Sequence, residues 1–313
     1  MDGAPFAAGS VSLRLYPHNE LDAGAVVEEL RTQARLGEAG GFAGIMVSEH
    51  HGGFAGYLPN PIQTAGFLLA ATDRVWVAPC PLLLPLRPAA LVAEEIAWLA
   101  AAYPGRVGLG VAAGALPLDF EVMGLELADA GPRFKAELGR VIAMLRGDDL
   151  GALAGDPALR RCVDDPVPVL SAAVSPVAAR RAASVGAGIL LDSMGALERQ
   201  RALTDAFAEA GGTGPRVALR RVWLGSPPEA ALAAQRALYE SYSPDAARQH
   251  WADANTIVAD DPGALAAQVS ESVLAAGCDA VNLRVHMNGV EPAAIRDQIA
   301  RLGAEVVPHL FVR

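Results

Sequence analysis

Segments typical of strands alternate with segments typical of helices along this chain, and this alternation constrains the fold more than any other feature. Each strand candidate is a short run rich in β-branched residues, and a stretch with helical spacing follows it. The pattern is typical of parallel strands joined by crossover helices. The strand candidates are 11–16, 44–50, 75–83, 106–112, 167–173, 188–193, 216–224 and 280–286.

The helix candidates fill the gaps between these strands. The stretch around Val27, Leu30 and Ala34 has helical spacing and is ended by Gly40-Gly41. About eight strand–helix units in one array predict an α/β fold, a (β/α)8 TIM barrel, with a doubly wound open sheet as the second possibility. The other helix candidates are 60–72, 89–102, 133–146, 176–185, 195–210, 229–241, 263–276 and 291–304.

The chain has no Pro-, Gly- and Ser-rich linker, so we predict a single domain over 1–313. Two stretches rich in Asp, Ala and Pro interrupt the alternation, at 147–166 and 242–262. Long irregular connections in compact domains are often lids or binding loops. Plain surface excursions are the equal alternative.

Charge and composition argue against several classes of partner. The chain has 25 basic and 35 acidic residues and a net charge of −10, which disfavours nucleic acids and anionic membranes. No apolar run approaches the roughly 20 residues of a spanning helix. The start, MDGAPFAAGS, lacks a signal-peptide pattern, so we expect a cytoplasmic protein. Cys80, Cys162 and Cys278 are widely separated and are expected to be reduced.

The tip of the second strand carries the sequence Ser48-Glu49-His50-His51. Active-site groups of a barrel come from the carboxyl ends of its strands, and a histidine is the side chain most readily poised as a base near neutral pH. Glu49 could orient one ring, and alternation along a strand allows only one of the two histidines to enter the pocket. A hydrogen-bonded packing role is about equally plausible. No metal site is predicted, because no convergent ligand set is present.

Two further strand tips carry groups suited to a ligand. The spacing of GLGVAAG (108–114) does not fit a dinucleotide fingerprint. Gly108 and Gly110 allow close approach of a flat ligand or a neighbouring backbone, or they serve barrel packing alone. Ser175-Pro176 has the chemistry of a helix start, whose free amides can hold a phosphate, although most such starts bind nothing.

Several common enzyme motifs are missing from the sequence. There is no Gly-x-Ser-x-Gly elbow, no Walker loop and no His-Glu-x-x-His motif, which argues against serine hydrolases, nucleotidases and metalloproteases. A barrel with an apolar pocket, histidines and a possible phosphate site remains. A phosphorylated cofactor is therefore plausible.

The sequence also resembles the bacterial luciferase-like flavin-dependent monooxygenase family. The most specific part of this resemblance is the Glu-His-His of GFAGIMVSEHHGG (41–53) together with the Asn-Pro of LPNP (58–61). The remaining matches follow in the same order and cover most of the chain. They are AATDRVWV (70–77), LLLPLRPAALVAEEIAWL (82–99), PGRVGLGVAAG (104–114), PRFKAELGRVIAML (132–145), VLSAAVSPVAARRAA (169–183) and VNLRVHMNGVEPAAIRDQIARLGAEVVPHL (281–310).

This resemblance implies a chemistry and a set of site residues. Reduced FMN, supplied by a separate flavin reductase, reacts with O2 to a flavin hydroperoxide that oxidises a small organic substrate. His50 matches the catalytic histidine of the family, beside Glu49. The cofactor-binding positions implied are the family's cis peptide at Cys80-Pro81, the ring contacts Ala112 and Ala113, and the phosphate turn Val174-Ser175.

The resemblance also implies pairing as a homodimer or a related heterodimer. Trp98 is expected either in such a contact or, with more weight, buried inside the monomer. Two positions depart from the family: Ala113 replaces its phosphate-binding arginine, and Ala100 replaces an aspartate. Losing such a charge-assisted contact costs about 1.5–3 kcal/mol of phosphate binding unless another group substitutes.

Two other functions stay open at this stage. One is a non-catalytic flavin-binding or partner subunit of the same fold. The other is a dehydrogenase that uses the deazaflavin coenzyme, although such enzymes typically carry a different sequence at the second strand tip.

Overall fold

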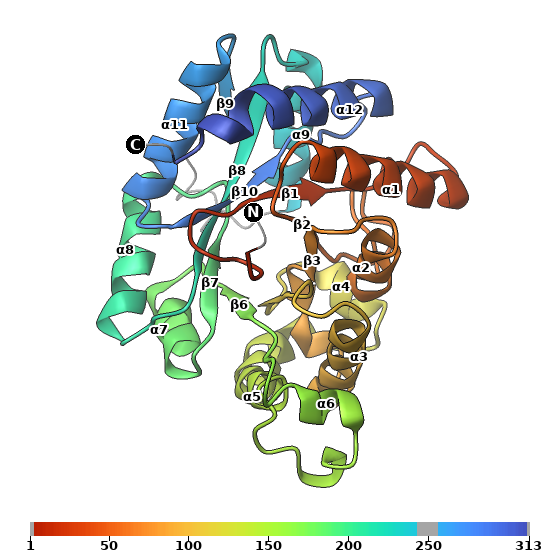
Figure 1. Cartoon of the computed structure of the whole chain (residues 1–313), viewed down its shortest axis with the longest axis vertical. Coiled ribbons are helices and arrows are strands. Elements are labelled where there is room, and N and C mark those ends of the chain that lie inside the picture. The colour runs from red at the N-terminus through yellow and green to blue at the C-terminus, as the bar shows by residue number, and fades with distance from the viewer. Residues whose placement is uncertain (1–2, 243–255, 312–313) are drawn as a thin grey trace.

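The strands form one parallel sheet that curves into a nearly closed ring (Figure 1). The computed structural model describes residues 3–242 and 256–311. The order of neighbouring strands is β3-β2-β1-β10-β8-β7-β6-β5-β4, and β9 pairs with β8. The strands are β1 (Val11–Leu15), β2 (Gly44–Val47), β3 (Trp76–Pro79), β4 (Leu82–Leu83), β5 (Leu109–Ala112), β6 (Val169–Ala172), β7 (Gly188–Leu191), β8 (Arg216–Leu224), β9 (Thr256–Ala259) and β10 (Ala280–Arg284).

The two ends of the strand order are halves of one interrupted strand. The Cys80-Pro81 peptide bond between β3 and β4 is cis, as predicted. β3 pairs with β2 and β4 pairs with β5, while Val77 also bridges to Val107. Counted as one strand, β3 and β4 close the ring that β1, β2, β5, β6, β7, β8 and β10 complete. The structure thus confirms the predicted parallel barrel.

One strand was not expected from the sequence. The stretch 242–262 was predicted to be an irregular connection, but β9 lies within it and pairs with Arg221–Leu224 of β8. β8 has nine residues and continues past the ring, so its outer half offers an edge to the β-branched run of β9. The prediction is wrong for 256–259, and 243–255 lie outside the described residues.

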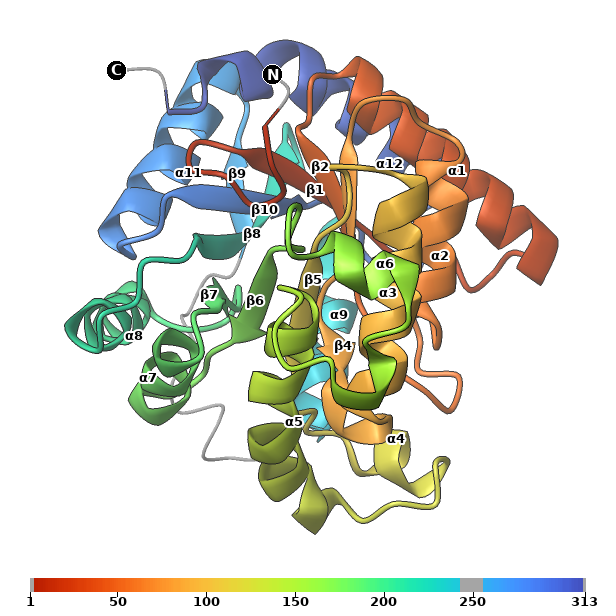
Figure 2. The ribbon, with the colours of Figure 1, turned by 60° about the horizontal axis from the view of Figure 1, so that its bottom comes forward.

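Helices surround the ring of strands (Figures 1 and 2). Their starts follow local chemistry: the Asp22 side chain accepts a hydrogen bond from the Ala25 amide at the start of α1, and Pro61 opens α2. The helices are α1 (Ala23–Ala39), α2 (Pro61–Leu69), α3 (Ala89–Ala102), α4 (Pro117–Glu121), α5 (Ala130–Met144), α6 (Pro157–Arg161), α7 (Pro176–Ser184), α8 (Leu197–Glu209), α9 (Glu229–Tyr242), α11 (Pro262–Ala275) and α12 (Pro292–Arg301). Of these, α4 and α6 were not predicted, and α6 lies in the stretch 147–166 that was expected to be irregular.

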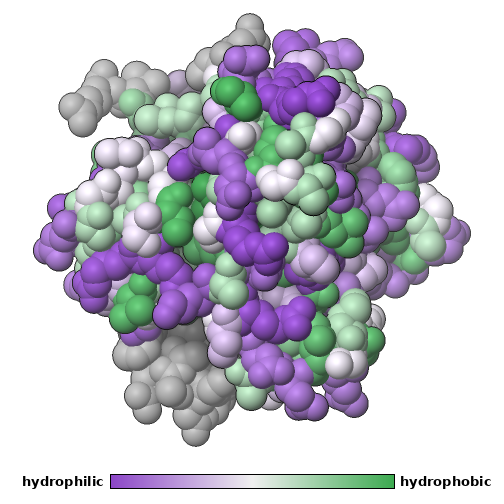
Figure 3. Space-filling view, turned by 90° about the horizontal axis from the view of Figure 1, so that it is seen from below, coloured by the Kyte–Doolittle hydropathy of each residue, from purple (hydrophilic) through white to green (hydrophobic). Residues whose placement is uncertain are grey.

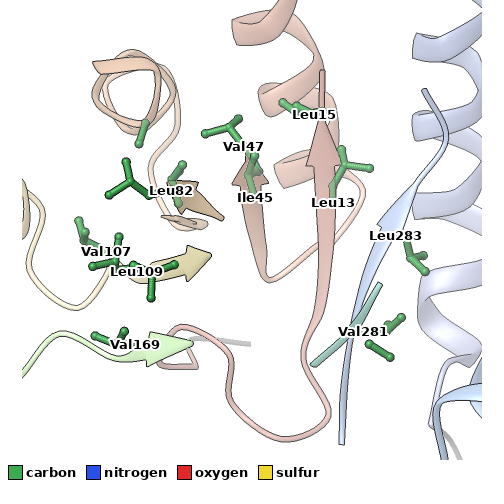
Figure 4. Packing of buried hydrophobic residues seen from close by; sticks show 14 of the residues in the cluster. Leu13, Leu15, Ile45, Val47, Leu82, Val107, Leu109, Val169, Val281 and Leu283 are labelled. Atoms are coloured by element: carbon green, nitrogen blue, oxygen red, sulfur yellow. The ribbon is translucent and has the colours of Figure 1, made fainter. Parts of the chain in front are cut away.

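Apolar side chains pack in two layers, one on each side of the strands. The larger layer lies between strands and helices, and Figure 4 shows part of it, including Leu13, Ile45 and Leu283. The smaller layer fills the ring and includes Phe6 and Trp76, whose ring centroids are 5.0 Å apart. This inner layer blocks one end of the barrel, so a ligand site must lie at the other end.

The glycines of the GLGVAAG segment serve this inner packing. A Cβ atom at Gly108 would lie 2.6 Å from the ring of Phe6, and one at Gly110 would lie 2.0 Å from Sγ of Cys80. Of the two alternatives drawn from the sequence, the packing account is therefore the one that the structure bears out.

The surface mixes polar and apolar residues. Figure 3 shows hydrophilic and hydrophobic residues intermingled on the face seen from below. None of the described helices is long and apolar enough to cross a membrane. Trp98 was expected to be buried, but it is 54% exposed and its Nε1 donates to Asp156 at 3.0 Å. It lies off the apolar stripe of α3, which buries Val92 and Ile96.

Candidate active site

A cavity of about 510 Å³ lies at the carboxyl ends of the barrel strands, a size typical of small-ligand sites. Its wall includes residues from the tips of strands around the ring and Tyr239 of α9, the helix seen through the ring in Figure 2. The site residues predicted from the sequence that line the cavity are Glu49, His50, Pro81, Ala112, Ala113 and Val174. Cys80 and Ser175 do not line the cavity, although each is the sequence neighbour of a residue that does, Pro81 and Val174.

His50 is held by a carboxylate that the sequence did not reveal. Its Nδ1 lies 2.8 Å from Oδ2 of Asp119, and Oδ1 of Asp119 accepts from the His51 backbone amide at 2.7 Å. Asp119 is fully buried, whereas 21% of the His50 side chain is exposed. The ring of His50 also lies edge-on to Tyr57, with centroids 4.4 Å apart. A buried carboxylate on Nδ1 fixes the ring and its tautomer, which leaves Nε2 for proton transfer.

Glu49 orients His51 and not His50. Its Oε1 lies 3.0 Å from Nε2 of His51 and also contacts Arg87, while its Oε2 accepts from the Leu83 amide at 2.5 Å. The Glu49 side chain is fully buried. His50 faces the cavity and His51 does not, as the alternation along the strand predicts. Glu49 therefore joins the tip of β2 to β4 and Arg87.

The Cys80-Pro81 bond lies beneath this part of the cavity. Pro81 contributes to the wall, and Cys80 is buried behind it with no exposed surface. Burial raises the pKa of the Cys80 thiol to about 11, despite attraction from Arg14. The thiol is therefore neutral near pH 7 and serves packing.

The start of α7 forms one end of the cavity. Ser175 is its N-cap, as predicted, and the Ser175 hydroxyl accepts from the Ala178 amide at 3.2 Å. Ala178 and Arg181 are three residues apart on one helix face, and both line the cavity. Arg181 is half-buried and lines the same cavity as Ala113, the position at which the resemblance expects an arginine. Arg181 was not predicted as a site residue, because it lies inside a helix and not at a strand tip.

Three further arginines line the cavity, and sequence reasoning missed all three: Arg14, Arg221 and Arg284. Arg14 Nε donates to Asn282 at 2.6 Å, and Arg284 Nη1 donates to the Tyr239 hydroxyl at 2.6 Å. Burial alone would raise the pKa of Tyr239, but attraction from Arg284 and Arg221 outweighs it and lowers the pKa to about 8. This side of the cavity is therefore strongly cationic.

No cluster of three or more His, Cys, Asp or Glu side chains that could hold a metal ion occurs among residues 3–242 and 256–311. The three cysteines are free and buried. The ionisable side chains that line the cavity are His50, the arginines, the tyrosines and the carboxylates of Glu49 and Asp192.

Comparison with known proteins gives a family match over most of the chain. Residues 10–306 match the family model described as luciferase-like monooxygenase. The chain is 32% identical to an F420-dependent glucose-6-phosphate dehydrogenase of Beutenbergia cavernae over 173 residues, which are 50% of each protein. The chain spans about half or less of the first curated relatives that it matches, from 41% to 50% of their length.

Solved structures share the fold across nearly the whole chain. Monooxygenase RslO1 from Streptomyces bottropensis superposes with a TM-score of 0.78 at 21% identity, covering 96% of this chain and 99% of that one. The oxygenating constituent of 3,6-diketocamphane monooxygenase from Pseudomonas putida, solved with FMN, gives 0.78 at 17% identity, covering 98% and 100%. At these identities the likeness establishes the fold alone.

Proposed function

The chain belongs to the luciferase-like monooxygenase family, and on this premise we propose that it is a flavin-dependent monooxygenase. It uses reduced FMN to insert one oxygen atom of O2 into a small organic substrate. The observation that carries the proposal is His50 on the cavity wall, fixed through Nδ1 by the buried Asp119. A base held in this way is what an oxygen-transfer site needs to move substrate protons.

The residues of the cavity suit a flat cofactor with a phosphate tail. Pro81, Ala112 and Ala113 present small or flat surfaces on which a ring system would rest. The Ser175-capped start of α7, its free amides and Arg181 would hold the phosphate. Arg181 would replace the charge missing at Ala113. This set of contacts supports FMN binding.

His50 and the walls would provide the rest of the chemistry. When bound, reduced FMN supplies the two electrons that O2 activation requires. Asp119 accepts a hydrogen bond from Nδ1–H of His50, so Nε2 carries the lone pair that takes a proton from the substrate. The largely apolar wall excludes water from the reacting atoms. Glu49 acts as a positioning residue for the strand tip.

A second candidate is a dehydrogenase that uses the deazaflavin coenzyme. Two curated relatives support it, F420-dependent glucose-6-phosphate dehydrogenases at 32% and 29% identity over about half of this chain. In that reaction His50 would accept the proton of a substrate hydroxyl. The Glu49-His50-His51 sequence at the β2 tip favours the monooxygenase.

We also propose a cytoplasmic protein that receives reduced FMN from a separate reductase. It would pair with itself or a related chain through α3, where Trp98 is exposed.

An anaerobic titration followed by oxygen separates the two reactions. The purified chain is titrated with reduced FMN and, separately, with oxidised deazaflavin coenzyme, and O2 uptake or deazaflavin reduction is then followed with a panel of small organic acids and alcohols. The proposal predicts binding of reduced FMN and substrate-dependent O2 uptake that is lost in His50→Ala. Reduction of the deazaflavin by an alcohol without O2 uptake would establish the dehydrogenase instead.

A further inference from the structure

Three arginines occupy one level of the barrel interior on three neighbouring strands. Arg284 of β10 pairs in register with Arg221 of β8. Leu13 of β1 pairs with Leu283 of β10, so Arg14 follows at the level of Arg284. All three side chains line the cavity. Neighbouring strands lie about 4.8 Å apart, and like charges directly opposite each other repel.

Arg284 is 3% exposed and only partly satisfied. Its Nη1 donates to the hydroxyls of Tyr239 and Tyr16 at 2.6 and 3.1 Å, and its Nε donates to the His286 carbonyl at 3.2 Å. Its Nη2 is buried and has no hydrogen-bond partner among the described residues. Nε of the neighbouring Arg221 is also buried and also has no hydrogen-bond partner among the described residues. Each of the two guanidiniums therefore has a buried N–H donor for which the described residues provide no acceptor.

No carboxylate within the described ranges pairs with these two arginines. The cavity wall has two carboxylates, and both are engaged elsewhere: Asp192 accepts from the amides of Met194 and Gly195, and Glu49 binds His51 and Arg87. The hydrogen-bond partners of Arg284 are two phenol hydroxyls and the His286 carbonyl, and the Arg221 guanidinium lies 4.7 Å from the centroid of the Tyr239 ring. Burying a charge without a counter-charge is costly, so this side of the cavity calls for an anion.

The position of the pair separates it from the phosphate end. In the ring order, β10 is four strands from β5 in both directions, counting β3 and β4 as one. The phosphate end is the Ser175-capped start of α7, which follows β6, and β6 is two strands from β8 and three from β10. The two groups therefore lie at separate strand tips. FMN has a single phosphate, which cannot neutralise both ends.

We propose that Arg221 and Arg284 bind the carboxylate of the substrate, which is a small apolar organic acid. This inference rests on the proposed function and names its substrate class. Two free donors on two guanidiniums match the two oxygens of one carboxylate. Tyr16, Tyr57 and Leu219 extend the wall from this pair, which suits a ring or hydrocarbon body.

A second cavity of about 440 Å³ adjoins the same pair. Arg221 and Arg284 line it together with His286 and Gln235, whose Nδ1 and Oε1 are buried without partners in the described structure. Burial and the nearby Arg284 lower the pKa of His286, so its ring is neutral and adds no positive charge. The carboxylate of the ligand would therefore lie beside Arg221 and Arg284, which line both cavities.

The test compares an acid with its neutral analogue. Calorimetric titration of the full chain without flavin uses benzoate and benzyl alcohol as probes. Arg284→Met and Arg221→Met should each weaken benzoate binding roughly 10- to 100-fold and change benzyl alcohol binding by about twofold or less. Arg140→Met is the matched control, and it should leave benzoate binding unchanged because Arg140 is 59% exposed and lies outside the cavity wall.

Several results would overturn the inference. These are failure of benzoate to bind the wild type at millimolar concentration, equal benzoate affinity in wild type and Arg284→Met, and tighter binding of phenyl phosphate than of benzoate. Weaker FMN binding by Arg284→Met with unchanged benzoate binding would assign the pair to the flavin and also overturn it.

Folding and function are checked separately. Circular dichroism establishes that each variant folds, and saturating benzoate should raise the Tm of the wild type but not of Arg284→Met. Arg221→Lys keeps the charge and should recover part of the benzoate affinity. The titration needs neither flavin nor turnover, so a failure of benzoate binding is distinguishable from a failure of the O2-uptake test of the proposed function.

Discussion

The tip of β2 and the tips of β8 and β10 face the same cavity but differ in how their polar groups are satisfied. At β2, both carboxylate oxygens of Asp119 are used, one by Nδ1 of His50 and one by the His51 amide. At β8 and β10, Arg221 and Arg284 keep buried N–H groups without partners in the described chain. The protein itself thus fixes the His50 ring, although the Ser48 hydroxyl at the same tip has no partner among the described residues, whereas Arg221 and Arg284 keep donors that a ligand would satisfy.

The largest effect is expected at the β2 tip. His50→Ala should lower substrate-dependent O2 uptake about 10²- to 10⁴-fold, because the variant loses its general base. Binding of reduced FMN should change little. His309→Ala, at an exposed position, is the control and should match the wild type. Stopped-flow O2 uptake measures both, and equal rates for His50→Ala and wild type would remove His50 from the mechanism.

Glu49 at the β2 tip should also contribute to the stability of the fold. Glu49→Gln removes a buried charge that contacts Arg87, His51 and the Leu83 amide, so we expect a loss of about 1–3 kcal/mol in the free energy of unfolding. Urea unfolding followed by circular dichroism gives this value. Glu305→Gln, in an exposed pair with Arg301, should change it by about 0.5 kcal/mol or less. Equal changes in the two variants would contradict a positioning role for Glu49.

A smaller effect is expected at the phosphate end. Arg181→Gln should weaken FMN binding by roughly 3- to 10-fold, less than a buried contact would, because Arg181 is only half-buried. Riboflavin lacks the phosphate, so its affinity should stay the same. Flavin fluorescence titration distinguishes the two ligands. An equal loss for FMN and riboflavin would place Arg181 away from the phosphate.

The smallest effect concerns Tyr239 on the cationic side. Its hydroxyl contacts Arg284, Tyr57 and Gln235, and its pKa in the folded chain is about 8, below the usual value near 10. A lowered pKa means that the ionised group adds stability fully above pH 10 and that this stability is lost as the pH falls through 8. The stability difference between wild type and Tyr239→Phe should therefore grow from pH 8 to pH 10. A difference that is constant with pH would contradict this.

The features that the sequence predicted well are those coded locally. The parallel barrel follows from repeated strand and helix patterns, and the caps, the cis Cys80-Pro81 bond and the cavity position of His50 depend on short segments. Asp119 escaped prediction because it reaches His50 across 69 residues, from a helix of five residues.

Arg221 and Arg284 were not predicted as site residues, for a related reason. Arg221 and Arg284 become neighbours only through the register of β8 with β10, which a single sequence does not reveal. The strand β9 was missed because its pairing depends on the outer half of β8, which extends past the ring. Both features arise from contacts between segments that are distant in the chain.

We propose that two separate sides of one cavity bind two different anions. A crystal structure of the protein with FMN and benzoate tests it directly. We expect the FMN phosphate at the start of α7 beside Arg181 and the benzoate carboxylate between Arg221 and Arg284. A structure with the FMN phosphate between Arg221 and Arg284 would contradict it.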